Sequence, residues 1–187
     1  YHLTIASTDS GDTYELAAGK TVVGNMTISS GVFTPSTYTV TFSGAGTQTL
    51  NTGGNTFYGL THSGSGTLQL SGNALTVSNA LTNSGGILSL NGQNLTATGA
   101  TFSNTATMQL IGSETITGLT QDTDSGTWVY VGDGDAGADT YTIKDFGATD
   151  YYHLTINGTD SADIFALGGT LTIASGATMT GSGGIFS

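Results

Sequence analysis

The sequence predicts an all-β protein, a right-handed parallel β-helix or solenoid with about 20 residues per coil and roughly nine coils. Two observations lead to this prediction. Apolar residues recur every 20 positions, in alternating stretches that end in glycine, asparagine or serine. In addition, β-forming residues are spread in short runs along all 187 residues, and only 8% of the residues are charged.

The first strand of each coil is the clearest element. Its copies TLQLSGN, ILSLNGQ, TMQLIGS and TWVYVGD begin at Thr67, Ile87, Thr107 and Thr127. Within each copy the apolar residues are two positions apart, which is the period of a strand with one buried face. The residues that fall in step are Leu50, Leu70, Leu90, Leu110 and Tyr130; Leu68, Leu88, Met108 and Trp128; and Gly46, Gly66, Gly86, Ala106 and Gly126.

A second strand follows the first in each coil, and a weaker third strand is expected after it. The second strand ends at Val77, Ala97 and Gly118, in the phrases ALTV, NLTA and TITG. The third is expected over residues 80–82, 100–102 and 119–120. Glycine and asparagine between the strands suit corners, because glycine adopts positive φ without steric cost and asparagine tolerates the left-handed region.

Two segments depart from the 20-residue period. The coil that contains Pro35 is expected to be shortened, with the proline at a corner or bulge because it cannot donate to a β-ladder. Between Tyr130 and Asp163 about 16 extra residues are expected, as one long loop insertion over residues 132–152 that includes the phrase GDGDAGADT. Insertions into a solenoid are displayed outside the rod, where they are free to bind a partner.

The main alternative fold is an antiparallel β-sandwich, which is also built from many short strands separated by glycine-rich turns. A sandwich has no physical reason to keep a 20-residue register through five consecutive copies. In a solenoid each strand pairs with its equivalent one coil above and below, so like residues stack on like. The register therefore favours the solenoid.

A longer repeat indicates how the chain is organised. Residues 1–5, with the sequence Tyr-His-Leu-Thr-Ile, recur as residues 152–156. The phrase TDSGD at residues 8–12 then recurs as TDSAD at residues 159–163. The two copies are 151 positions apart, which is several coils along the rod.

We expect one solenoid segment over residues 1–187, in which residues 1–151 form a complete module and residues 152–187 begin a second. Gly31 to Phe33 recur as Gly184 to Phe186, now two positions out of step. Because the repeat stops in mid-module, the solenoid is expected to continue beyond both ends.

The charge of the chain excludes several partners. Its formal net charge is −11, its only strongly basic side chains are Lys20 and Lys144, and it has no arginine. Binding to nucleic acid or to an anionic membrane surface depends on such residues, so neither partner is expected. No apolar stretch is long enough for direct membrane insertion. The acidic charge makes a divalent cation the more natural small partner. The absence of cysteine excludes disulfides and thiolate chemistry.

Asp133, Asp135 and Asp139 are the candidate metal ligands. They lie among glycines in the expected insertion, and carboxylate oxygens on a flexible loop suit calcium. Their spacing is similar to the EF-hand loop and to the Gly-Asp nonapeptide of calcium-binding β-rolls, but it matches neither. The pattern favours a solvated acidic loop, with a calcium site as the alternative.

Four further aspartates form two pairs that are repeat mates, Asp9 with Asp12 and Asp160 with Asp163. Aspartate and serine at a corner commonly accept hydrogen bonds from nearby backbone amides, so these residues are expected to cap turns. Calcium binding between modules is the alternative.

The sequence does not predict an enzyme. It has no nucleophile elbow, zinc-protease, P-loop or dinucleotide-binding motif. His2, His62 and His153 cannot be assigned to a catalytic triad and are expected at the surface or at corners. Parallel β-helices include polysaccharide lyases and hydrolases, but the chain has two lysines, and only Glu15 and Glu114 as glutamates. Threonine pairs suit an ice-binding face only if they recur at one coil position, and here they do not.

The phrases YYHLTINGTDSADIFALGGTLTIASGATMTGSGG and GTQTLNTGGNTFYGLT resemble the repeats of very large bacterial surface proteins, akin to filamentous haemagglutinin and autotransporter passenger solenoids. The likeness covers nearly the whole chain and rests on repeat texture and the aromatic-x-Leu-Thr-Ile phrase. It carries no residue-specific functional motif. It implies export, a long rod, and a role in adhesion, surface coating or fibre formation.

The predicted function is that of a structural module in a secreted bacterial cell-surface or extracellular fibre or adhesin. Its expected partner is itself, as a head-to-tail homopolymer or as tandem modules, because open coil ends are sheet edges and edges invite pairing. The alternative is a calcium- or glycan-binding module that acts through residues 132–152, with surface glycans as partners.

Overall fold

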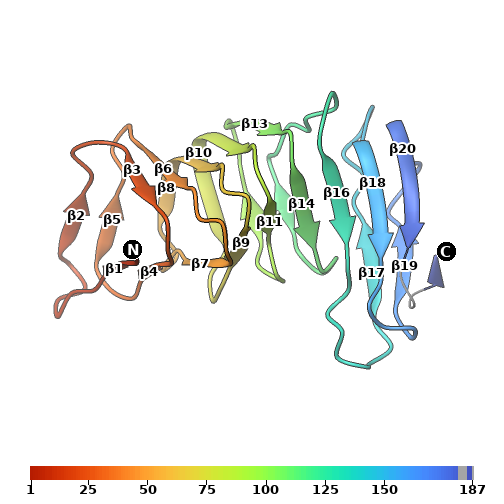
Figure 1. Ribbon diagram of the computed structural model, residues 1–187, viewed down its shortest axis with the longest axis horizontal. Helices are drawn as coiled ribbons and strands as arrows, with labels where there is room; N and C mark the ends of the chain where they lie inside the picture. The colour runs from red at the N-terminus through yellow and green to blue at the C-terminus, as the bar shows by residue number, and fades with distance from the viewer. Residues whose placement is uncertain (181–184, 187) are drawn as a thin grey trace.

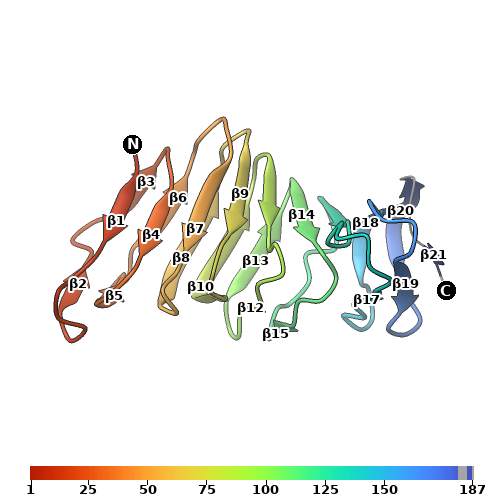
Figure 2. The same ribbon diagram turned by 90° about the horizontal axis from the view of Figure 1, so that it is seen from below.

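A computed structural model describes residues 1–180 and 185–186 and shows a parallel β-solenoid of about nine coils. The coils follow one another along the longest axis, from the N-terminal coil at one end to the C-terminal coil at the other (Figures 1 and 2). Every strand pair runs parallel, which confirms the solenoid and excludes the antiparallel sandwich. The described part of the chain has no helix, and so none that could cross a membrane.

Four parallel sheets form the walls of the coils in the described residues. Sheet 1 has nine strands: β1 (Leu3–Ile5), β4 (Met26–Ile28), β7 (Gln48–Asn51), β9 (Thr67–Leu70), β11 (Ile87–Ser89), β14 (Thr107–Leu110), β16 (Thr127–Tyr130), β18 (Tyr151–Asn157) and β20 (Ile173–Thr180). Sheet 2 contains β3 (Lys20–Val22), β6 (Thr39–Phe42), β8 (Thr56–His62), β10 (Leu75–Asn83), β12 (Leu95–Thr96) and β15 (Ile116–Thr117), with β13 (Thr101–Asn104) also paired to β10. Sheet 3 contains β17 (Thr140–Ile143), β19 (Ile164–Leu167) and β21 (Ile185–Phe186), and sheet 4 contains β2 (Thr13–Glu15) and β5 (Val32–Thr34).

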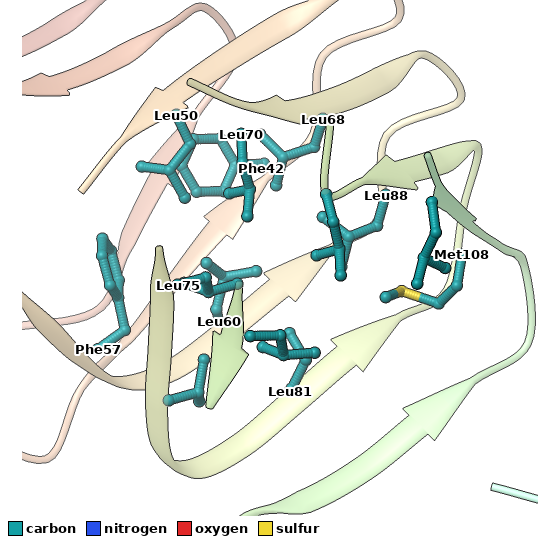
Figure 3. Close-up of a cluster of buried hydrophobic side chains, with 14 of the residues drawn as sticks. Phe42, Leu50, Phe57, Leu60, Leu68, Leu70, Leu75, Leu81, Leu88 and Met108 are labelled. Atoms are coloured by element: carbon teal, nitrogen blue, oxygen red, sulfur yellow. The ribbon is translucent and has the colours of Figure 1, made fainter. Parts of the chain in front are cut away.

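The predicted 20-residue register holds through the middle of sheet 1. The paired residues are Leu50 with Leu70, Leu68 with Leu88, Leu88 with Met108, Met108 with Trp128, and Leu110 with Tyr130. All of these side chains are buried, and Figure 3 shows those from Leu50 to Met108 facing a common interior. The core is therefore a set of stacked apolar columns enclosed by the sheets.

The coils toward the ends of the rod are longer. Leu3 pairs with Met26 and Met26 pairs with Leu50, which are spacings of 23 and 24 positions. The coil that contains Pro35 is one of these, so the expectation that it is shortened was wrong. The residues on either side of Pro35 form β5 and β6, two walls of one coil. Pro35 itself lies at a corner, as predicted, and its carbonyl accepts a hydrogen bond from the Tyr38 amide (3.0 Å).

The predicted insertion is smaller than expected. Thr127 pairs with His153, 26 positions later, so this coil exceeds the 20-residue period by six residues and not by about 16. Residues 131–139 form a loop that extends beyond the strand ends (Figure 1). The rest of the predicted segment, residues 132–152, includes β17, which pairs with β19 and belongs to the wall. Its strand-forming Thr-Tyr-Thr-Ile phrase was wrongly counted as loop.

The second predicted strand is confirmed as β10, β12 and β15. The third is confirmed in two coils, where it continues β10 and forms β13, but residues 119–120 form no strand. In this coil the Asp122 carboxylate accepts a hydrogen bond from the Asn104 amide (2.7 Å). A side chain thus takes the place of the backbone partner that a third strand would offer to β13.

The two copies of the long repeat fold alike. Leu3 pairs with Met26 and Leu154 pairs with Ala177, at 23 positions in both cases. The division into modules of residues 1–151 and 152–187 stays a prediction, and Gly184, with which the last sequence match begins, lies outside the described residues.

Candidate functional site

Three carboxylates meet at the outer corner between two successive coils, and we call them the acidic cluster. Asp133 lies in the loop after β16, Asp139 directly precedes β17, and Asp163 directly precedes β19. One carboxylate oxygen of each residue lies within 4.8 Å of those of the other two. The cluster therefore joins the coil of β16 and β17 to the coil of β18 and β19.

Backbone pairing between the coils sets this arrangement. The Ile164 amide donates to the Asp139 carbonyl (2.8 Å), which begins the β17–β19 ladder and places Asp139 beside Asp163. The Asp139 amide in turn donates to Asp163 Oδ1 (3.4 Å). On the loop side, the amide and hydroxyl of Thr159 both donate to the Val131 carbonyl (3.1 and 3.2 Å). Both ends of the loop are thus tied to the following coil.

Asp163 has the most unusual environment of the three residues. Its side chain is fully buried, and its Oδ2 atom has no hydrogen-bond partner. Gly132 makes room for this atom, because a Cβ at that position would lie 2.3 Å from Asp163 Oδ2. Burial raises the pKa of Asp163, and the neighbouring charges of Asp160, Asp133 and Asp139 raise it further against the hydrogen bond from the Asp139 amide.

Tyr141 packs beside the cluster on β17. Its ring centroid lies 5.5 Å from that of Phe165 of the next coil, with the two rings tilted by 33°, and its buried hydroxyl has no hydrogen-bond partner. Burial raises the pKa of Tyr141 above its ordinary range, and Asp133 and Asp163 add to the shift. The tyrosine is therefore a neutral neighbour of the carboxylates.

The structure separates the predicted metal ligands. Asp133 and Asp139 join the cluster, whereas Asp135 is exposed on the loop and its Oδ1 accepts a hydrogen bond from the Gly137 amide (2.6 Å). Asp163, for which the sequence favoured turn-capping with calcium binding between modules as the alternative, is the third member. The signal that points to it is its position directly before a strand, as for Asp139, but this becomes informative only once the register of β17 and β19 is known.

Of the four aspartates expected to cap turns, Asp9 and Asp160 accept a backbone hydrogen bond within their turn. Asp9 Oδ1 accepts a hydrogen bond from the Gly11 amide, and Asp160 Oδ1 accepts one from the Ala162 amide, both at 2.9 Å. Asp12 is exposed and accepts a hydrogen bond from the Ser7 hydroxyl. Asp12 thus lies in the turn before β2 that corresponds to the turn of Asp163 before β19, but among the described residues it belongs to no carboxylate cluster.

The three histidines lie far apart along the rod. His2 is exposed, and its Nδ1 accepts a hydrogen bond from the Asn25 amide (2.9 Å). His153 Nε2 contacts the Thr178 hydroxyl (3.3 Å). His62 is the last residue of β8 and is fully buried, not at the surface or a corner as expected, and its Nδ1 contacts Asn83 Oδ1 (2.9 Å).

The two glutamates have unrelated environments. Glu15 is exposed on β2, in the first coil. Glu114 is fully buried between β14 and β15, where its carboxylate accepts hydrogen bonds from the amides of Gly92, Ile111 and Gly112 (2.7–2.9 Å). Glu114 therefore holds a corner in place, a role that the sequence analysis missed.

No protein-family profile matches this chain, and no curated protein or solved structure is similar enough to it to count as a match. The acidic cluster is consequently interpreted from its own chemistry. The cluster offers three carboxylate ligands, and one of their oxygens is buried without a hydrogen-bond partner. Such a donor set suits a hard divalent cation.

Proposed function

We propose that this chain is a structural module of a secreted bacterial surface fibre or adhesin, in which the solenoid continues from one module into the next. The observation that carries the proposal is the pairing of β18. This strand repeats the sequence of β1. On its upstream side it pairs with β16, so that Trp128 lies beside Leu154 and Tyr130 lies beside Ile156. β1 offers the same Leu-Thr-Ile surface and has only β4 as a neighbour among the described strands.

Side-chain exposure at the two repeat copies supports the same proposal. Tyr14 on β2 is 37% exposed, whereas its repeat mate Phe165 on β19 is fully buried. Phe165 is covered by Tyr141 of the preceding coil, with the ring centroids 5.5 Å apart. A preceding module would cover Tyr14 in the same way and would add a β16-like strand to the free edge of β1.

The C-terminal coil supports stacking at the other end. A largely apolar cavity of about 440 Å³ opens there, lined by Leu154, Ile156, Leu167, Leu171 and Ile173 with four smaller neighbours. Leu167 is 43% exposed. Exposed apolar side chains near the end of a solenoid gain free energy when another coil covers them, so this cavity favours further stacking.

Electron microscopy and sedimentation of the purified chain test the proposal. We expect slender rods that stack end to end as the protein concentration rises. Globular particles without rods or stacking would contradict the proposal.

A proline variant sharpens this experiment. The Leu3 amide donates to Asn25 and the Ile5 carbonyl accepts from Ser29, so the Thr4 amide between them faces the free edge. Thr4→Pro should reduce stacking with little change in the melting temperature. The matched variant Thr155→Pro, at the repeat mate inside the rod, should lower the melting temperature because Thr155 pairs with Val129.

A second candidate function, calcium binding, is favoured by the unpartnered oxygen of Asp163. Glycan binding stays a prediction with no residue attached to it.

A further inference from the structure

We propose that the acidic cluster is a calcium site that clamps the coil of β18 and β19 onto the coil of β16 and β17. Asp133 and Asp139 would bind the ion from the upstream coil, and Asp163 would bind it from the downstream coil. The coil of β18 and β19 begins with the repeated Tyr-His-Leu-Thr-Ile phrase, so the clamp lies at a boundary between modules. That boundary role rests on the proposed function, whereas calcium binding itself does not.

The buried oxygen of Asp163 is the observation that points to a ligand. A fully buried carboxylate is costly unless each oxygen is hydrogen-bonded, paired or bound to a metal. Asp163 Oδ1 receives a single long hydrogen bond of 3.4 Å, and Oδ2 receives none. Two other buried carboxylates, Glu114 and Asp150, each accept three backbone hydrogen bonds, whereas the neighbouring Asp160 also has one oxygen without a partner. Asp163 therefore differs from Glu114 and Asp150, whose carboxylates are fully hydrogen-bonded to backbone amides.

The charge distribution of the cluster supports a cation. Three carboxylate oxygens within 4.8 Å of one another repel when all are ionised, and Asp160 adds to the negative charge felt by Asp163. A bound divalent cation attracts all three carboxylates and so offsets their mutual repulsion. Gly132 strengthens the case, because only glycine leaves the space that Asp163 Oδ2 occupies.

The donor set favours calcium over other metal ions. All three side chains offer oxygen, which suits calcium, whereas zinc and copper sites generally include nitrogen or sulfur ligands. Asp133 and Asp139 keep contact with solvent, so water can complete a shell of six to eight oxygens. The irregular loop over residues 131–139 suits the flexible geometry of calcium better than the strict octahedron of magnesium.

Because the ligands come from both coils, an ion that binds them stabilises the contact between the coils. A ligand that binds only the folded state raises its stability in proportion to the logarithm of its concentration over Kd. Calcium should therefore raise the melting temperature of the chain as well as give heat on binding.

Calorimetry and thermal melting of the full chain with calcium chloride, after treatment with a chelator, test the proposal. We expect one calcium ion per chain and a higher melting temperature. Asp163→Asn and Asp133→Asn should each weaken binding by at least about 10-fold, because each removes a charged ligand. The exposed position of Asp133 keeps its variant informative even if Asp163→Asn alters folding.

Two matched controls make the same change of charge. Asp135→Asn lies in the same loop but outside the cluster, and Asp12→Asn changes the repeat mate of Asp163. Both should bind calcium as the unmodified chain does. The proposal is overturned if the unmodified chain shows neither heat nor a melting shift, or if Asp135→Asn loses calcium as fully as Asp163→Asn. Rod stacking is measured separately, so its failure would leave the calcium result intact.

Discussion

Glu114 connects two coils through its carboxylate. One oxygen accepts hydrogen bonds from the Gly92 amide of the preceding coil and from the Ile111 amide, and the other accepts one from the Gly112 amide. Buried backbone amides must be paired somewhere, and at this irregular corner no strand is available to pair them. The carboxylate supplies the acceptors that the missing strand would have supplied.

Replacing Glu114 should therefore destabilise the fold without affecting calcium binding. Glu114→Ala leaves three backbone amides without their acceptors, so we expect the free energy of unfolding to fall by about 3 kcal/mol or more. Urea denaturation measures this change. Glu15→Ala, at an exposed position on β2, serves as control and should stay within about 0.5 kcal/mol. Equal effects of the two substitutions would contradict the assigned role.

His62 begins a buried polar column that continues through Asn83 and Asn104. His62 Nδ1 contacts Asn83 Oδ1 (2.9 Å), and Asn83 Nδ2 donates to Asn104 Oδ1 (2.8 Å). Burial lowers the pKa of His62 below its ordinary value of 6.5, against a smaller opposite effect of Asn83. The folded state therefore favours the neutral imidazole.

This shift predicts a pH dependence with a defined sign. Below about pH 6.5 the unfolded state binds a proton at His62 more readily than the folded state, so stability falls as the pH is lowered. His62→Asn, which extends the asparagine column, should remove this part of the dependence. Melting temperatures of both proteins from about pH 8 to pH 5 measure it. Asp163 has a raised pKa, so its contribution to stability changes with pH in the opposite direction to that of His62. This contribution is the same in both proteins. Identical pH profiles would contradict the prediction.

At the scale of the element, the corners before β9 and β11 are built on close backbone contact. A Cβ at Gly66 would lie 2.1 Å from the Gly46 carbonyl oxygen, and a Cβ at Gly86 would lie 1.9 Å from the Gly66 carbonyl oxygen. Successive coils approach so closely here that no side chain fits between them. The predicted glycine column thus has a steric origin, in addition to the positive φ of 51° at Gly86.

The same geometry predicts unequal effects within one column. Gly66→Ala should lower the free energy of unfolding by about 3 kcal/mol, because the added methyl group overlaps a backbone carbonyl that cannot move alone. Gly46→Ala should be nearly neutral, because no atom lies within 4 Å of a Cβ at that position. Chemical denaturation of the two variants tests the contrast, and a loss of similar size in both would argue against stacked corners.

For the whole molecule, coil stacking makes length a direct function of the number of residues. Strands in neighbouring coils lie about 4.8 Å apart, so the rod lengthens by that amount per coil while its cross-section stays the same. The strands of sheet 1 follow this order from β1 to β20 without a change of direction (Figure 2).

A tandem chain tests this relation together with the module prediction. If residues 1–151 are placed directly in front of the present chain, the added copies of β1, β4, β7, β9, β11, β14 and β16 should lengthen one continuous rod by about 34 Å. Small-angle X-ray scattering should show an unchanged cross-section and a longer maximum dimension. Two jointed bodies, or a thicker particle, would contradict a continuous solenoid.

The candidate site was only partly predictable from the sequence. Asp133 and Asp139 were recognisable because acidic residues on a glycine-rich loop indicate oxygen ligands. For Asp163 the sequence favoured turn-capping over calcium binding, because its place beside Asp139 depends on the ladder between β17 and β19, in which partners are 24 positions apart. Asp135 looked equivalent to its neighbours in sequence, but it is not one of the three aspartates whose carboxylate oxygens lie within 4.8 Å of one another.

The sequence by itself determined the class of fold, the 20-residue period and the apolar columns, because a parallel ladder requires like residues at equal spacing and that spacing is visible in Leu68, Leu88 and Met108. Only the tertiary structure decided the length of the end coils, the walls around Pro35 and the membership of the acidic cluster. Corners are held by individual hydrogen bonds between coils, such as those of Glu114, and their strand register depends on how the backbone closes in space.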